Sequence, residues 1–145
     1  MEDLEALARR ALELMDAGKL DEWERTMDPD CDFVAPGAAL HGRRAVREFV
    51  AGFRQAFPDV HHTIDSLYAV GDTVLMEATF AGTHDGPLRS PAGAIPPTHR
   101  KVEIKEAQIV QVRDGLAVSV RTYFDRMAMM GQLGLLPSPA AAQSS

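Results

Sequence analysis

Five polar side chains on the last predicted hairpin could carry out acid–base chemistry if they share one face of a sheet. The dipeptide Asp114-Gly115 favours a two-residue turn, which pairs Arg113 with Leu116. Strand alternation then places on one face Glu106, Gln108, Arg121, Tyr123 and Asp125. Carboxylates in such a set can transfer protons, while Arg121 and Tyr123 could hold a substrate carbonyl or anion. An ion pair between Glu106 and Arg121 across the hairpin is the alternative.

The preceding hairpin carries a second, mostly apolar set. Gly71-Asp72 predicts a two-residue turn that pairs Val70 with Thr73. One face then collects His61, Thr63, Asp65, Leu67, Ala69, Val74, Met76, Ala78, Phe80 and His84. Asp65 and His84 are the pocket candidates of this set. A single β-bulge would reverse such an assignment, and the polar residues would otherwise face solvent or a subunit interface.

The sequence argues against metal and nucleic-acid sites. His61 and His62 are adjacent on a strand, so they point to opposite faces and cannot bind one metal ion. The single cysteine, Cys31, is expected to pack in the core. The formal net charge is −6, and no cationic cluster is larger than Arg43-Arg44. A protein that binds the phosphate backbone needs clustered cations, so no nucleic-acid partner is expected.

The length and composition indicate one compact unit. The chain has 145 residues, 46% of them hydrophobic, which suffices for a core with an interior cavity. We expect one domain over residues 1–137 and a flexible tail over residues 138–145. The first twenty residues are acidic rather than basic, and no run approaches the roughly eighteen apolar residues of a membrane helix. The sequence therefore predicts a cytoplasmic protein without a membrane partner.

Three helices are expected to precede the sheet. One-sided apolar stripes predict helices from Leu4 to Gly18, from a cap at Asp21 to Asp28-Pro29, and from Gly42 to Pro58. A short strand is predicted over residues 31–35. After Pro58 the apolar period changes to two, which predicts the two hairpins.

The two hairpins are joined by a Pro-rich loop over residues 85–97. The strand over residues 73–84 is so long that it must bend, with Gly82 as the candidate kink. A short helix follows Asp125. This order of elements predicts an α+β fold with a curved antiparallel sheet and three N-terminal helices over one face.

A set of short motifs resembles the SnoaL-like polyketide cyclase family of the nuclear-transport-factor-2-like superfamily. The motifs span residues 41–136 and are His41-Gly42-Arg43, Phe57-Pro58-Asp59, Gly82-Thr83-His84-Asp85-Gly86, Pro96-Pro97-Thr98, Asp114-Gly115, Tyr123-Phe124-Asp125 and Gln132-Leu133-Gly134-Leu135. The resemblance implies a cone-shaped domain with a pocket between the sheet and the helices. It also implies a homodimer or homotetramer and no metal or organic cofactor.

The same resemblance implies a catalytic role for Asp125. In the cyclases, an aspartate near the end of the last strand is the general acid/base of an intramolecular aldol ring closure, and Asp125 occupies the matching place. Where these cyclases have a histidine, about fourteen positions earlier, this chain has Gln111. Glu106 and Gln108 are near enough to serve as hydrogen-bond partners instead. The expected pocket residues are His84, Glu106, Gln108, Arg121, Tyr123, Phe33, Phe53 and Asp65.

The expected function is that of a cofactor-independent cyclase or isomerase acting on a hydrophobic, carbonyl-bearing, polyketide-like substrate. Several alternatives stay open. Asp125 could simply cap the helix that follows it. Asp65, Arg121 and Asp125 could open an epoxide, and dehydration is a related reaction. The domain could also bind a ligand or partner without catalysis, or act as a structural module whose aromatic side chains fill the pocket.

Overall fold

The computed structural model describes residues 3–90 and 93–136. The helices are α1 (Leu4–Asp16), α2 (Leu20–Glu24), α3 (Arg43–Ala56) and α4 (Arg126–Gln132). The strands are β1 (Met27–Ala35), β2 (Ala38–His41), β3 (His61–Val70), β4 (Thr73–Thr83), β5 (Leu88–Ser90), β6 (Gly93–Ile95), β7 (Lys101–Arg113) and β8 (Leu116–Phe124). The predicted tail, residues 138–145, lies outside the described residues.

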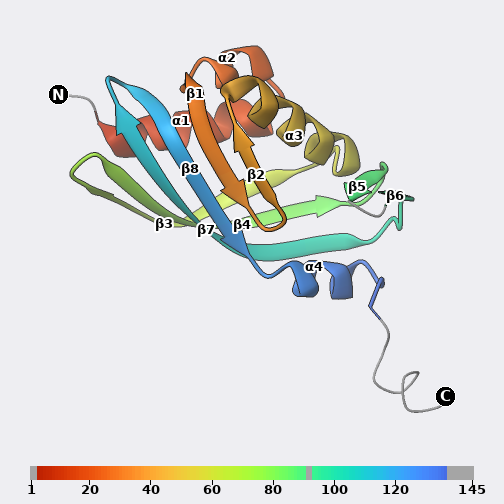
Figure 1. The fold of residues 1–145 in the computed structure, drawn as a ribbon. Helices are drawn as coiled ribbons and strands as arrows, with labels where there is room; N and C mark the ends of the chain where they lie inside the picture. The colour runs from red at the N-terminus through yellow and green to blue at the C-terminus, as the bar shows by residue number, and fades with distance from the viewer. Residues whose placement is uncertain (1–2, 91–92, 137–145) are drawn as a thin grey trace.

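The six-stranded main sheet has the order β2-β1-β8-β7-β4-β3 and is curved, with α1, α2 and α3 on one side of it (Figure 1). The predicted α+β class is confirmed. One pair departs from the antiparallel expectation, since β1 runs parallel to β8. These two strands come from distant parts of the chain, so no hairpin turn fixes their relative direction. The Pro-rich connection contains a separate two-stranded sheet, β5-β6.

Local chemistry explains where the helices begin and end. Asp3 caps α1, because its side chain accepts a hydrogen bond from the backbone N–H of Ala6. The helix α2 begins at Leu20, so the cap predicted at Asp21 is wrong. The Asp21 carboxylate instead binds the guanidinium of Arg47 on α3. The helix α3 ends before Pro58, as predicted, because proline disfavours helical backbone in the residue that precedes it.

Both predicted hairpin turns are present, but each hairpin contains a register shift. Val70 pairs with Thr73 and Arg113 with Leu116, as expected from the turns. Further along, Asp65 of β3 and Val118 of β8 have no partner in the sheet register. Each extra residue is a β-bulge, and it moves the following side chains to the other face of the sheet. The face toward the helices, called the inner face below, is therefore set by these two bulges.

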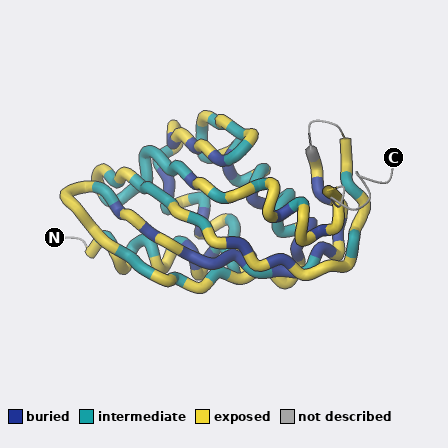
Figure 2. The backbone as a smooth tube through the Cα atoms, turned by 90° about the horizontal axis from the view of Figure 1, so that it is seen from below, coloured by how far each residue is buried: buried dark blue, intermediate teal, exposed yellow. Residues whose placement is uncertain are grey.

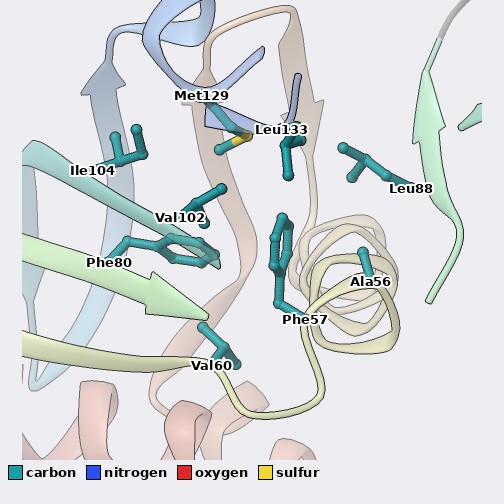
Figure 3. Packing of buried hydrophobic residues seen from close by; sticks show 9 residues of the cluster. All are labelled: Ala56, Phe57, Val60, Phe80, Leu88, Val102, Ile104, Met129 and Leu133. Atoms are coloured by element: carbon teal, nitrogen blue, oxygen red, sulfur yellow. The ribbon is translucent and has the colours of Figure 1, made fainter. Parts of the chain in front are cut away.

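Figure 2 shows buried stretches running through the sheet toward β5 and β6, whereas the hairpin turns at the opposite end are exposed. One core cluster lies near β5 and is centred on Phe57, which is fully buried (Figure 3). Its other members are Ala56, Val60, Phe80, Leu88, Val102, Ile104, Met129 and Leu133. A Cβ added at Gly82 would lie 3.1 Å from the Cβ of Phe57, so this glycine permits the close approach of Phe57 to β4.

Replacing Gly86 with alanine should destabilise the fold by about 2 kcal/mol, in the range of overpacked core substitutions. The backbone N–H of Gly86 donates to the carbonyl of Ala56, and an added Cβ would lie 1.9 Å from the carbonyl oxygen of Gln55. Gly52→Ala is the matched control, because a Cβ at Gly52 on α3 meets nothing within 4 Å. Urea unfolding should show this control equal to or more stable than wild type. Equal stability of the two variants would contradict the prediction.

Candidate active site

A cavity of about 180 Å³ lies between the inner face of the sheet and helices α1 and α3. Most of its lining is apolar, including Leu7 and Ala11 of α1, Phe49 and Phe53 of α3, and Val110 of β7. Polar side chains interrupt this lining where α1 ends. A cavity with apolar walls and a few polar groups is the usual form of a small-molecule site.

The polar group of the cavity is a chain of three side chains, Asp16, His62 and Glu106. His62 Nδ1 lies 2.7 Å from Asp16 Oδ1, and His62 Nε2 lies 3.2 Å from Glu106 Oε1. The side chains of His62 and Glu106 are only 6% and 7% exposed, so water screens these contacts weakly. All three residues line the cavity.

Three different elements hold this chain in place. The backbone N–H of His62, at the start of β3, donates to Asp16 Oδ2 at 2.7 Å. Asp16 is the last residue of α1, and Arg54 Nη1 of α3 donates to the carbonyl oxygens of Met15 and Asp16, each at 2.9 Å. This cation caps the helix end, where the backbone carbonyls lack helical partners. Glu106 pairs with Ala78 of β4 and Phe124 of β8.

His62 is an imidazolium at neutral pH. Each of its ring nitrogens faces a carboxylate oxygen, and a carboxylate can only accept, so both nitrogens must donate. Burial lowers the pKa of His62, but the hydrogen bonds and negative charges of Asp16 and Glu106 outweigh burial and raise the pKa to about 9.

Glu106 keeps one oxygen available for chemistry. Its Oε1 accepts from His62 Nε2 and from Gln108 Nε2, the latter at 3.3 Å. Within residues 3–90 and 93–136, the side-chain hydrogen bonds and ion pairs of Glu106 all involve Oε1 and leave Oε2 without such a partner. A carboxylate that is fixed through one oxygen in an apolar cavity can take up or deliver a proton through the other.

The structure divides the predicted pocket residues into two groups. The cavity lining includes Phe33, Phe53, Glu106 and Gln108. The residues outside the lining are Asp65, His84, Arg121, Tyr123 and Asp125. The set considered for epoxide opening, Asp65, Arg121 and Asp125, is thus not brought together in the cavity.

The two bulges explain the placement of three of these residues. Asp65 is itself the bulged residue of β3, and it accepts hydrogen bonds from Thr79 Oγ1 at 2.7 Å and Lys105 Nζ at 3.2 Å. The bulge at Val118 pairs Arg121 with Ile109 and Tyr123 with Ala107, on the outer face of the sheet. Tyr123 is 49% exposed there.

His84 is buried near the β5-β6 connection rather than in the cavity. Its ring packs against Phe57, with 5.5 Å between the ring centroids, and its Nδ1 lies 3.0 Å from Thr98 Oγ1. Burial lowers the pKa of His84. Its backbone N–H donates to the carbonyl of Arg100, so the residue anchors the return of the connection to the sheet.

Asp125 caps α4. Its Oδ1 accepts from the backbone N–H of Ala128 at 3.1 Å, and the residue is exposed. Asp125→Ala should cost about 1 kcal/mol of stability, whereas Asp125→Asn should cost little, because asparagine caps helices as well as aspartate does. Thermal unfolding of the two variants checks this difference. A loss of the same size in Asp125→Asn would contradict the capping role.

Two members of the polar chain, Asp16 and His62, are not predicted by the sequence reasoning. Strict alternation places His61 on the inner face, and the bulge at Asp65 replaces it with His62. The spacing of apolar residues in β3 is a weak sequence signal of this bulge, because Ile64 and Leu67 are three positions apart rather than two. Nothing in the sequence marks the pairing of Asp16 with this strand.

Two further properties concern the described part of the chain alone. Across residues 3–90 and 93–136, no cluster of three or more His, Cys, Asp or Glu side chains is placed to hold a metal ion. The helices described here are all too short or too polar to cross a membrane.

Solved structures share the fold of this chain. TsrD from Streptomyces laurentii is 23% identical, with a TM-score of 0.81 over 94% of this chain and 100% of that one. IdmH from Streptomyces antibioticus, assigned as a polyketide cyclase, is 24% identical, with a TM-score of 0.75 over 89% and 96%. A Catenulispora acidiphila protein with a ketosteroid isomerase-like fold is 20% identical, with a TM-score of 0.75 over 92% and 97%.

The chain therefore shares a ketosteroid isomerase-like fold, with a largely apolar cavity between the sheet and the helices. The family model of SnoaL-like polyketide cyclases matches residues 5–133, so the chain belongs to the SnoaL-like polyketide cyclase family. None of the curated proteins matches the chain.

Proposed function

We propose that the protein is a cyclase or isomerase that moves a proton on a hydrophobic, carbonyl-bearing substrate, with Glu106 as the catalytic base. The observation that carries this proposal is the chain of Asp16, His62 and Glu106 in an otherwise apolar cavity. Family membership supports a cyclase or isomerase class. Asp125 lies at a helix cap outside the cavity lining, which favours Glu106 for the acid–base role.

The proposed reaction begins with proton removal beside the carbonyl. Glu106 Oε2 takes the proton, and the electrons of the broken C–H bond form an enolate. In isomerisation, the protonated Glu106 returns its proton to another carbon. In ring closure, the enolate carbon attacks a second carbonyl, and the resulting alkoxide receives the proton. Both routes regenerate the carboxylate and balance without an oxidant or a reductant.

The neighbouring side chains position this base. His62 donates to Glu106 Oε1, and Asp16 fixes the imidazolium through Nδ1, so the carboxylate has one orientation. Gln108 has an amide group beside Glu106 and could donate to the oxygen of the enolate, where negative charge develops.

Proton exchange on a small ketone tests the proposal without knowledge of the natural substrate. With 1-indanone in D₂O, the protein should accelerate loss of the α-proton signal in ¹H NMR, and Glu106→Gln should remove most of this acceleration. Exchange that is unaffected by Glu106→Gln would overturn the assignment of the base. The size of the effect and the matched control are argued in the Discussion.

A further inference from the structure

We propose that the cavity accepts compact, flat, neutral ketones of one or two fused rings, and that Phe49 limits the size of the ligand. The ligand's orientation, with its carbonyl group toward Glu106 and Gln108, rests on the proposed function. The limit on its size rests on the walls of the cavity alone.

The first argument is the volume of the cavity. At about 180 Å³, it is slightly larger than an apolar cavity of about 150 Å³ that binds benzene. It is smaller than the 300 Å³ or so at which sites for drug-sized ligands begin. A one-ring ketone or a compact two-ring ketone matches this space, whereas three or four fused rings would not fit wholly inside it.

The second argument is the shape of one wall, here called the aromatic wall. It consists of Phe33, Phe49, Phe53 and Phe80, which all line the cavity. Successive ring centroids are 5.5, 5.3 and 6.2 Å apart, and the rings are tilted or edge-on to one another. The wall ends at His62, whose ring centroid lies 5.4 Å from that of Phe80. A flat ring can make the same tilted and edge-to-face contacts with this wall.

The third argument is the charge of the lining. The lining carries the carboxylates of Asp16 and Glu106 and the cations of His62 and Arg54. His62 is already held by both carboxylates, and Arg54 Nη1 is held by two backbone carbonyls. An anionic ligand with its charged group toward Glu106 and Gln108 would meet the negative charge of Glu106. A neutral carbonyl avoids this repulsion and still accepts a hydrogen bond.

Phe49 is the residue to which we assign the size limit. It lies between Phe33 and Phe53 in the aromatic wall and is only half-buried, so its ring is not locked inside a fully buried core cluster. Truncation of this ring would widen the cavity between Phe33 and Phe53. Ala11 of α1 also lines the cavity, so a larger side chain there would reduce the space for a ligand.

The test compares binding of acetophenone, 1-indanone and anthrone, which contain one, two and three rings. The single tryptophan, Trp23, lines the cavity, so quenching of its fluorescence and calorimetry report binding together. The wild type should bind 1-indanone at least tenfold more tightly than anthrone. Phe49→Ala should reduce this ratio at least fivefold, and Ala11→Leu should weaken 1-indanone binding at least tenfold. Phe49→Leu keeps an apolar side chain and should also reduce this ratio. It replaces Phe49→Ala in the test if the alanine variant fails to fold.

Leu75→Ala is the matched control, because Leu75 is on the outer face of β4, between the lining residues Val74 and Met76. It should leave all three affinities unchanged. Equal wild-type binding of anthrone and 1-indanone, binding of none of the ketones, or an unchanged ratio in both Phe49 variants would overturn the proposal. The size order should persist in Glu106→Gln. If Glu106→Gln keeps the size order and also keeps the wild-type rate of proton exchange, the proposed base is wrong and the size limit stands.

Discussion

Glu106→Gln should slow protein-dependent α-proton exchange of 1-indanone by about 10²- to 10⁴-fold, the usual range for loss of a general base. Glutamine has nearly the shape of glutamate, so the cavity volume and the aromatic wall should stay the same. Its amide cannot take up the proton that Oε2 of the carboxylate accepts. Binding of 1-indanone should therefore change much less than the exchange rate, and NMR measures both quantities on one sample.

Asp125→Asn is the matched control for this experiment. It removes the carboxylate that the family resemblance implies as the catalytic group, and it preserves the cap on α4. We expect its exchange rate to stay close to that of wild type, because Asp125 is exposed and lies outside the cavity lining. A large loss in Asp125→Asn together with a normal rate in Glu106→Gln would place the base at the end of β8 and refute the proposed site.

The protein should lose about 3 kcal/mol of stability between pH 6.5 and pH 9 through His62 alone. Folding raises the pKa of this histidine from its ordinary value of 6.5 to about 9. Between these two pH values the folded state binds a proton that the unfolded state has lost, so the free energy of unfolding falls as pH rises. The contribution is fully present below pH 6.5 and is lost as pH rises through about 9. The groups that face the ring are Asp16 on α1 and Glu106 on β7.

Urea unfolding at several pH values measures this effect. His62→Gln should lower stability at pH 6 and flatten its decline toward pH 9. His61→Gln is the control, because His61 is exposed and its side chain lies on the other face of β3. It should retain the wild-type slope. A His62→Gln slope as steep as that of wild type would show that the imidazolium is not held between the two carboxylates.

The helices and turns of this fold follow from local sequence chemistry. The apolar stripe of α3 and the turn at Asp114-Gly115 are both where the sequence predicts them, and both turn residues have the positive φ that the turn requires. The pairing of strands that are distant in the sequence is harder to predict from local sequence patterns. The strand β2 and the parallel contact of β1 with β8 depend on tertiary packing, and β1 even contains Pro29, at a break in its register.

The candidate site was harder to predict than the fold, because a side chain's face depends on the parity of the strand register. One bulge at Val118 moves Arg121 and Tyr123 to the outer face, although the turn residue Gly115 is placed correctly. Glu106 and Gln108 line the cavity, since they lie on the strand without the extra residue. Single-residue insertions in strands leave weak sequence signals, so residue types alone could not decide between His61 and His62.

The first helix, α1, both orients His62 and lines the cavity. Asp16, at its last position, orients the imidazolium of His62, while Leu4, Leu7, Ala8 and Ala11 of the same helix line the cavity. A graft of residues 4–16 from another family member would therefore exchange the fit to the ligand and the support of the base in one step. For laboratory evolution, this makes α1 a compact module for changing selectivity while the sheet that carries Glu106 stays intact.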